Sequence, residues 1–438
     1  MANFYLLGNG FDIHHKLPTR YIDMLNICQF ILDNKNKKYE SLYGLVKDYL
    51  NENDDSFFKE YLKIYEKRLL EIKLVSDDFN KVYALENNCW YKYIIACRSS
   101  NDKWIDFEAI IQRVLKLFEA LFHDNEYSLF LKQHKRNNHE DLEYSKTVYV
   151  EKLADYFDNV LGDGDERRQG FLFKQCFMQI DVGHRAYICY KEKQIVDNLY
   201  EHLEVFKNIL KYYLLLFVDS VLLVEGEEYQ STHVGFLKNF NPESDYIISL
   251  NYTATVEHIY SVPSQCVHHY HGKLDSHIVL GVNATQDDEF NESLIPNTRF
   301  IKFKKYYQRA YYDTDASYLE MMFRDREQHR MKKETREAFD RVTSAYRMTN
   351  MARNVISFRD EVFPPEKNGR KILVVIGHSL DITDGEIIRK LFEQCELIRV
   401  YYHNDIARGD YIENLVRIFG KSEFEIMRTT GRLEFAVL

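Results

Sequence analysis

The sequence lacks a hydrophobic run long enough to cross a membrane. Its longest apolar stretch, from Tyr212 to Val224, includes Asp219 and is shorter than the roughly 20 residues that a membrane-spanning helix needs. We therefore expect a buried helix there and no contact with a membrane. The first apolar run is also short and soon meets Asp12 and His14, unlike the core of a secretory signal. These absences predict a cytoplasmic protein.

Cysteine pairs and chain breakers are also scarce. The seven cysteines include no Cys-x-x-Cys spacing, which argues against a zinc ribbon and against a disulfide framework. Only 17 glycines and six prolines occur in 438 residues. This scarcity favours long helices over a sandwich of many short strands.

An excess of basic residues is absent too. The formal net charge is −10, so no overall basic field attracts the protein to nucleic acid, and we do not expect a nucleic-acid partner. A hydrophobic content of 45% in 438 residues is enough for a large core. Such a length fits one large domain with insertions, or about two to three domains.

Hydrophobic periodicity divides the chain into a β/α part and a helical part. Short apolar runs typical of buried strands occur near both ends, at 4–7, 246–250, 267–270, 278–281, 372–376 and 397–402. Between them the helical period dominates, for example at 57–75, 104–122, 148–160 and 195–224. The fold class that we expect is therefore α/β, a Rossmann-like parallel sheet with a large helical insertion.

The same pattern predicts the domain boundaries. We expect residues 1–38 and 241–438 to form the nucleotide-binding sheet domain, with charged helices at about 306–358. Residues 39–240 are expected to form the inserted, mostly helical domain.

Each predicted strand ends in a glycine or polar turn. Gly8-Asn9-Gly10 follows the first strand, and glycine there lets backbone amides approach a phosphate beside a helix N-terminus. An ordinary strand-to-helix corner is the alternative. Later strands end at Asn251-Tyr252-Thr253, His271-Gly272, Gly377-His378-Ser379 and Tyr402-His403-Asn404. Ligands of parallel sheets bind at the carboxyl ends of the strands, so these turns predict one shared site.

These segments, taken in order, resemble motifs of two protein families. Gly8 to Pro18 is similar to the sirtuin loop Gly-Ala-Gly-x-Ser followed by Gly-Ile-Pro, and Asn251 lies in a segment similar to Thr-Gln-Asn-x-Asp. His271-Gly272 falls where sirtuins have their catalytic His-Gly. A closer resemblance is to the bacteriophage abortive-infection family AbiH, through Gly8 to Thr19, Trp104 to Glu108, Asn251 to Glu257 and Gly377 to Asp384.

The sirtuin resemblance implies that NAD binds across the sheet, and it assigns roles to individual residues. Asn251 would hold the nicotinamide ribose hydroxyls or the attacking water, and His271 would act as general base on a ribose hydroxyl. The residues that would line the NAD site are Gly8, Asn9, Gly10, Asp12, Pro18, Thr19, Gly377, Ser379 and Asn404. The AbiH resemblance adds Glu108 and Asp384 as further candidates.

Simpler structural explanations compete at three of these positions. Asn251 could cap the helix that follows it. Glu108 lies at the start of a predicted helix, where a carboxylate is favoured by the helix dipole alone. Asp12 stands where sirtuins have a small residue, and its carboxylate would repel a pyrophosphate unless it caps a helix or binds ribose.

A metal site is the alternative for the cluster His268, His269 and His271. Side chains alternate along a strand, so His268 would point away from the other two, and no cysteine or carboxylate lies at ligand spacing nearby. We therefore expect no metal.

The family resemblances imply an antiphage abortive-infection effector that hydrolyses the nicotinamide–ribose bond of NAD. The zinc-binding cysteine pairs of deacylating sirtuins are absent, so protein deacetylation is not expected. Two other functions stay open: a non-catalytic sensor of NAD or ADP-ribose that signals through the helical domain, and a metal-dependent nuclease or phosphoesterase using His271, Asp12 and Glu108. A homo-oligomer and a phage-derived trigger are expected, because a lethal enzyme must be held inactive until infection.

Overall fold

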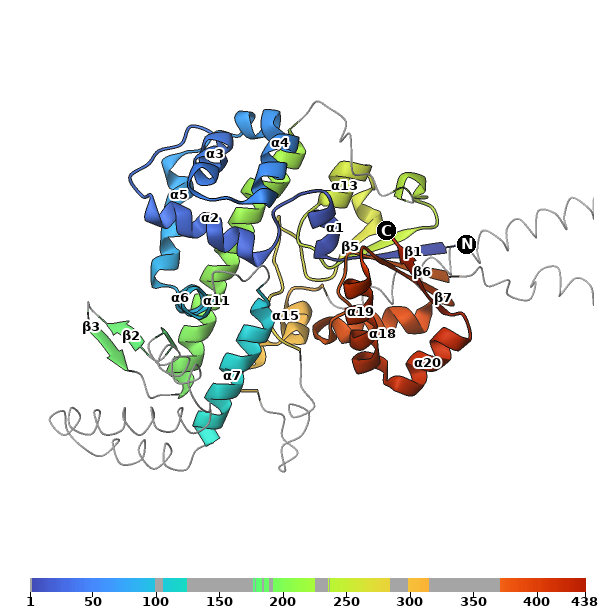
Figure 1. The fold of residues 1–438 in the computed structure, drawn as a ribbon. Coiled ribbons are helices and arrows are strands. Elements are labelled where there is room, and N and C mark those ends of the chain that lie inside the picture. Colours follow the sequence, from blue (N-terminus) through green and yellow to red (C-terminus); the bar gives the residue numbers. More distant parts are fainter. Residues whose placement is uncertain are drawn as a thin grey trace, which may run out of the picture.

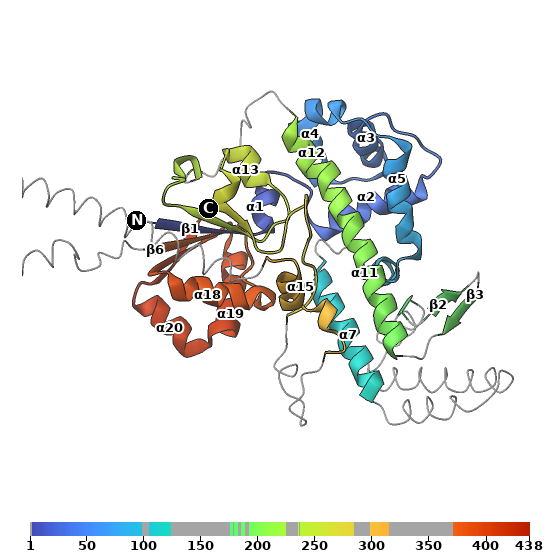
Figure 2. The same cartoon turned by 180° about the vertical axis from the view of Figure 1, so that it is seen from behind.

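Two structural parts, a parallel β-sheet flanked by helices and a block of helices, face each other in the computed structural model (Figure 1). The structure describes residues 2–98, 105–123, 176–177, 179–182, 185–188, 192–224, 235, 237–283, 298–314 and 371–438. The carboxyl edge of the sheet, where β1 runs into α1, faces the helical block (Figures 1 and 2). Side chains from both parts can therefore meet at this edge.

The sheet has six strands in the order β5-β4-β1-β6-β7-β8, and all their pairings are parallel. Numbered along the chain, the strands run 3-2-1-4-5-6, the order of the doubly wound dinucleotide-binding fold. The prediction of a parallel sheet built from both ends of the chain is confirmed. The strands are β1 (Ala2–Leu7), β4 (Tyr246–Ser249), β5 (Val267–His269), β6 (Lys371–Ile376), β7 (Leu397–Tyr402) and β8 (Leu433–Val437).

Helices cover both faces of the sheet because its central strands are apolar on both sides. Phe4 and Leu6 of β1 belong to the core under one face, while Tyr5 and Leu7 belong to the core under the other. The first core is closed by α18 (Gly385–Gln394), α19 (Asp405–Phe419) and α20 (Lys421–Thr429), and the second by α1 (Asn9–His14) and α13 (Thr255–Tyr260).

The helical block has a core of its own, rich in large aromatic side chains such as Trp90, Tyr61 and Phe107. Several of its helices begin at a capping side chain. Ser41, Asp55 and Asn88 accept hydrogen bonds from the first free amides of α3 (Leu42–Glu52), α4 (Ser56–Glu71) and α6 (Cys89–Cys97). The helices are α2 (Tyr21–Asp33), α3 (Leu42–Glu52), α4 (Ser56–Glu71), α5 (Ser76–Tyr83), α6 (Cys89–Cys97), α7 (Phe107–His123), α11 (Glu192–Leu214) and α12 (Ser220–Leu223).

The connection between the two parts consists of α7, α15 (Lys305–Tyr311) and the first chain segments after β1. Both views place α7 and α15 between the sheet and the rest of the helical block (Figures 1 and 2). The side chains of α2 pack in the core of the helical block, although only α1 and a short loop separate α2 from β1. The predicted boundaries at residues 38 and 241 stay predictions.

Most predicted elements agree with the structure, but one predicted strand is wrong. Residues 278–281 do not form a strand: Ile278 makes a single antiparallel bridge to Gly272, because the chain folds back against the turn after β5. The predicted helix at 148–160, and the charged stretch beyond residue 314, lie outside the described residues. A hairpin of β2 (Gln179–Val182) and β3 (Arg185–Ile188) was not predicted.

The stretch from Tyr212 to Val224 is helical, as predicted, and continues α11 through a π-helical turn into α12. Among the helices that the structure describes, none combines the length and apolar character that crossing a membrane requires.

Candidate functional site

Three glycines bring the ends of β1 and β6 into direct backbone contact. A Cβ atom on Gly10 would lie 2.7 Å from the Gly377 carbonyl oxygen, and one on Gly8 would lie 2.7 Å from the His378 Cα. Gly377 has φ +64°, which favours glycine, and a Cβ there would lie 2.2 Å from the Phe11 nitrogen. Since β1 and β6 connect onward in opposite directions, this junction is the topological switch point of the sheet.

The amides of Gly8 and Gly10, which the sequence predicts as pyrophosphate donors, are engaged within the protein. The Gly8 amide donates to the Ile376 carbonyl at 3.1 Å, and the Gly10 amide donates to the Gly377 carbonyl at 2.7 Å. In this arrangement the glycines serve close approach of two backbones, and their amides do not point at a ligand.

Asn251, at the end of β4, ties its strand to the same junction. Its Nδ2 donates to the Gly8 carbonyl at 3.0 Å. The capping alternative is wrong, because α13 begins after Ala254 and has no side-chain cap. On the other side of Gly8, Thr19 donates its hydroxyl to Asn9 Oδ1, and Pro18 beside it is buried. These residues therefore lie around the first β–α turn, as the sequence predicts.

Asp12 points into the protein, beneath the turn. Its Oδ2 accepts from the Thr253 hydroxyl at 2.6 Å, while its Oδ1 has no hydrogen-bond partner among the described residues. Burial raises the pKa of Asp12 to about 7, with a further increase from Asp219 that hydrogen bonds from Thr253 and its neighbours oppose. Near neutral pH this carboxyl group is therefore partly protonated, and it does not present a full negative charge to a ligand.

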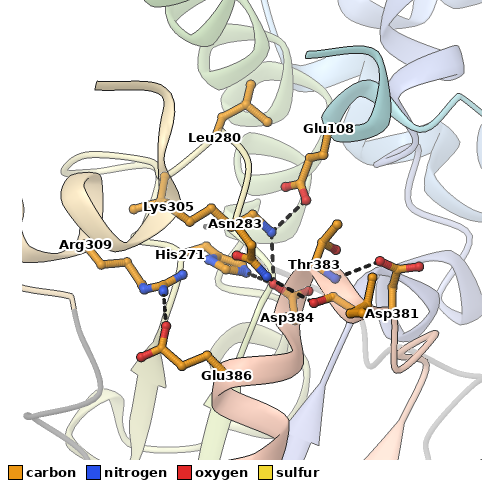
Figure 3. A network of polar contacts seen from close by, with 12 residues as sticks. Glu108, His271, Leu280, Asn283, Lys305, Arg309, Asp381, Thr383, Asp384 and Glu386 are labelled. Atoms are coloured by element: carbon orange, nitrogen blue, oxygen red, sulfur yellow. Dashed lines mark hydrogen bonds and ion pairs between the residues drawn. The ribbon is translucent and has the colours of Figure 1, made fainter. Parts of the chain in front are cut away.

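A buried ionic network lies beside the junction, where the sheet meets the helical block (Figure 3). Lys305, the first residue of α15, contacts Glu108 Oε2 at 2.7 Å and Asp384 Oδ1 at 2.9 Å. Asp384 ends the 3-10 turn Ile382–Asp384 and also contacts His271 Nε2 at 2.9 Å and His378 Nε2 at 3.2 Å. The Lys305 side chain is 1% exposed, and the most exposed members of the network are Glu108 (16%) and Asp384 (12%).

Hydrogen-bond donors and acceptors fix the proton positions on both histidines. His378 Nδ1 accepts from the Leu380 amide, so its proton is on Nε2 and is donated to Asp384. His271 likewise donates from Nε2 to ionised Asp384. Its Nδ1 is then an unprotonated nitrogen, buried and without a hydrogen-bond partner in the described part of the chain. This nitrogen is a free base site.

The pKa values of the network follow from burial and from Lys305. Burial lowers the pKa of His271 to about 4, against the opposing effect of Asp384 and with help from Lys305. Burial raises the pKa of Glu108 to about 7, although Lys305 opposes this. Burial also disfavours the anion of Asp384, but Lys305 and His271 hold the pKa of Asp384 well below its ordinary value. At neutral pH His271 is therefore neutral and Asp384 is ionised.

The tight turn after β5 explains the His271-Gly272 pair. Gly272 has φ +82°, and a Cβ atom there would lie 1.8 Å from the His277 carbonyl oxygen. The His271 carbonyl accepts from the Val279 amide at 2.7 Å, which holds the histidine against the returning chain. Only glycine fits after His271 in this conformation.

His269, the last residue of β5, has contacts different from those of His271. Its Nδ1 lies 3.0 Å from the Asn251 carbonyl oxygen, and its Nε2 lies 3.0 Å from Glu257 Oε1. Burial raises the pKa of Glu257, but His269 and Lys273 hold it below its ordinary value, so this group only accepts. The His269 ring therefore links Glu257 to the backbone at Asn251 and holds the end of β4 in place.

Two predicted NAD contacts have structural roles at the surface. Asn404 is exposed and caps α19, accepting from the Ala407 amide at 2.8 Å. Ser379 is exposed, and its carbonyl accepts from Asn414 Nδ2. Among the described residues, the buried network is made of other side chains, Glu108, His271, Lys305, His378 and Asp384.

Two histidines of the suspected metal cluster bind different carboxylates. His269 faces Glu257, and His271 faces Asp384. The described residues include no group of three or more histidine, cysteine, aspartate or glutamate side chains placed to hold a metal ion.

Sequence reasoning brought Glu108, His271 and Asp384 to one place, but it missed Lys305 and His378. His378 had a usable signal, because it directly follows the glycine at the end of an apolar strand. Lys305 stands in a pair of lysines at the start of an ordinary amphipathic stretch, and nothing in its local sequence marks it.

The fold and the network define an α/β protein with the doubly wound strand order and a buried histidine–carboxylate centre at the switch-point edge. A family model described as Bacteriophage abortive infection AbiH matches residues 4–402, and the chain belongs to this family. Membership implies a part in abortive infection by bacteriophage. Comparison with curated proteins and with solved structures gave no match.

Proposed function

We propose that this protein is an abortive-infection effector that hydrolyses NAD at the nicotinamide–ribose bond during phage infection. The single observation that carries the catalytic part is the buried, unprotonated Nδ1 of His271, which has no hydrogen-bond partner among the described residues while Asp384 accepts from the opposite ring nitrogen. The strand order 3-2-1-4-5-6 supports a dinucleotide as ligand, because such sheets bind dinucleotides at the switch point. The family supports the biological setting.

The proposed reaction needs a base and an environment that favours positive charge on the ribose. The bond between C1′ and the nicotinamide nitrogen breaks, its electron pair neutralises the pyridinium ring, and the ribosyl centre becomes oxocarbenium-like. Asp384 and the ionised fraction of Glu108 together exceed the charge of the Lys305 ammonium, which suits developing positive charge. Water adds to C1′, and its proton passes to His271 Nδ1, giving ADP-ribose and free nicotinamide.

The proposal assigns the remaining residues according to their geometry. Asn251 holds the ribose hydroxyls or the attacking water, since its side chain is fixed beside the switch point by the Gly8 carbonyl. Gly8, Gly10 and Gly377 provide the close packing that brings His378 to Asp384. Because the two amides of the first turn are engaged, this proposal does not use them as pyrophosphate donors.

The test is release of nicotinamide from NAD by the purified protein, alone and in lysate of phage-infected cells. We expect His271→Gln to slow release by at least about 100-fold, since it removes the base. The matched control is His277→Gln, because His277 is exposed and its ring only stacks on Tyr312. Equal rates for wild type and His271→Gln, or no release by wild type under either condition, would contradict the proposal. Tight NAD binding without release would instead favour the sensor.

A further inference from the structure

Lys305 is a buried cation to which the proposed reaction has so far given no chemical role. Its ammonium donates to Glu108 Oε2 at 2.7 Å and to Asp384 Oδ1 at 2.9 Å, with 1% of the side chain exposed. A buried ammonium is costly unless its donors are paired, so Lys305 holds this position only while both carboxylates face it.

The oxygen that Lys305 contacts is the same oxygen that receives His271. Asp384 Oδ1 accepts from Lys305 Nζ and from His271 Nε2, both at 2.9 Å, while Oδ2 accepts from His378. The ammonium of Lys305 beside Oδ1 also helps to hold the pKa of Asp384 well below its ordinary value, so the carboxylate does not take up a proton near neutral pH. With Lys305 in place the carboxylate stays an acceptor only, and the proton of His271 must stay on Nε2.

We propose that Lys305 is a positioning residue that, through Asp384, keeps the proton of His271 on Nε2 and leaves Nδ1 free as the base. This inference rests on the proposed base role of His271. Lys305 does not touch the reacting atoms. It acts by holding the carboxylate that selects the histidine tautomer.

Each charged group near Lys305 and Asp384 either raises or lowers the pKa of His271. Asp384 favours the protonated ring, whereas Lys305 and Arg309 disfavour it, and burial disfavours it most. Arg309 is itself paired with Glu386 at 2.6 Å, His378 is fixed by Asp384, and Glu108 is held by Lys305. Removing the ammonium therefore raises the pKa of His271 from about 4 toward its ordinary value.

The experiment follows the ring nitrogens of His271 by NMR in full-length protein labelled with 15N-histidine. The His271→Gln variant identifies the signals of this ring. The test variant is Lys305→Met, which keeps most of the length of the side chain and removes the charge. Because Glu108 would then lose its ion-pair partner while Asp384 keeps only its two histidine donors, a second variant combines Lys305→Met with Glu108→Gln to preserve folding. Lys207→Met is the matched control, since Lys207 is also buried and paired, with Glu204 at 2.8 Å.

The expected result is a neutral ring with its proton on Nε2 in wild type and in the Lys207→Met control from pH 7.5 to pH 5. In the Lys305 variants we expect either a change of tautomer or protonation with a midpoint at least one pH unit higher, and partial recovery in Lys305→Arg. Where nicotinamide release is measurable, its acid limb should move upward by the same amount. An unchanged His271 titration in the folded double variant would overturn the inference.

The two proposals fail in different ways. If wild-type protein releases no nicotinamide but the ring of His271 responds to Lys305 as described, the function is wrong and the positioning role stands. If nicotinamide is released and depends on His271, while its tautomer and titration ignore Lys305, the function stands and the positioning role is wrong.

Discussion

Burial at the carboxyl edge of the sheet gives individual ionisable side chains unusual pKa values. Burial raises the pKa of Asp12 to about 7 and lowers that of His271 to about 4. Both side chains keep one polar atom without a hydrogen-bond partner among the described residues, Asp12 Oδ1 and His271 Nδ1. Such groups are costly to bury, and these two lie at or beside the proposed site.

The raised pKa of Asp12 makes folding stability depend on pH. Between about pH 4 and pH 7 the unfolded chain has released this proton while the folded protein still holds it, so stability falls as pH rises through this window. In Asp12→Asn this contribution is absent, because an amide does not titrate. We expect the unfolding free energy of Asp12→Asn, relative to wild type, to increase by about 1 kcal/mol or more from pH 5 to pH 7.5.

Urea unfolding at several pH values measures this difference, and the variant-minus-wild-type comparison cancels the other titrating carboxyl groups. Asp410→Asn, on the exposed surface of α19, is the control and should show no such trend. A difference between Asp12→Asn and wild type that stays constant over this pH range would contradict the assignment.

The sequence identified some of the residues that meet at this edge, but not what they do there. Asn251 and His271 could be predicted because polar residues directly follow apolar strands, and parallel strands end at one edge. The partner of His271 was only suggested by a family resemblance, and Lys305 was missed. Its two ion-pair partners, Glu108 and Asp384, are far away in the chain, and such a meeting leaves no local pattern.

The contact between the β1–α1 turn and the end of β6 determines how the elements of the sheet edge fit together. Gly377 combines a positive φ with the absence of space for a Cβ atom. We expect Gly377→Ala to destabilise the protein by at least about 2 kcal/mol more than Gly420→Ala, which has only the positive φ to accommodate. Gly409→Ala, in open space within α19, should be neutral or stabilising by about 0.5–1 kcal/mol.

Urea unfolding midpoints of these three variants separate two effects. The difference between Gly377→Ala and Gly420→Ala reports the close backbone contact, and Gly420→Ala alone reports the cost of the positive φ. Equal losses in Gly377→Ala and Gly420→Ala would show that the junction is looser than described.

Five of the six strands of the sheet were predicted, including β5 at one edge, but β8 at the other edge was not. β6 and β7 are apolar over most of their length and agree closely with the predicted strands at 372–376 and 397–402. β8 was not predicted, because it is an edge strand with exposed residues and therefore lacks a continuous apolar pattern. The segment at 278–281 is apolar because it is buried where the chain folds back. Hydrophobic periodicity alone cannot distinguish such a buried turn from a short strand.

The whole molecule joins its two parts through the same ions that hold His271. Glu108 comes from α7 of the helical block, Asp384 from the segment after β6, and Lys305 from α15 between them (Figure 3). A displacement of α7 would therefore alter the surroundings of Lys305 and, through Asp384, those of His271. This linkage gives a physical route by which an event at the helical block can change the state of the proposed base.

The most direct test of the central claim follows NAD in phage-infected cells that carry either wild-type protein or His271→Gln. With wild type, NAD should fall by about tenfold or more after infection, with nicotinamide and ADP-ribose rising, and phage yield should drop. With His271→Gln, NAD should stay at the level of infected cells without the protein, and protection should be lost. Wild-type protection with NAD unchanged, or equal NAD loss with His271→Gln, would contradict the account.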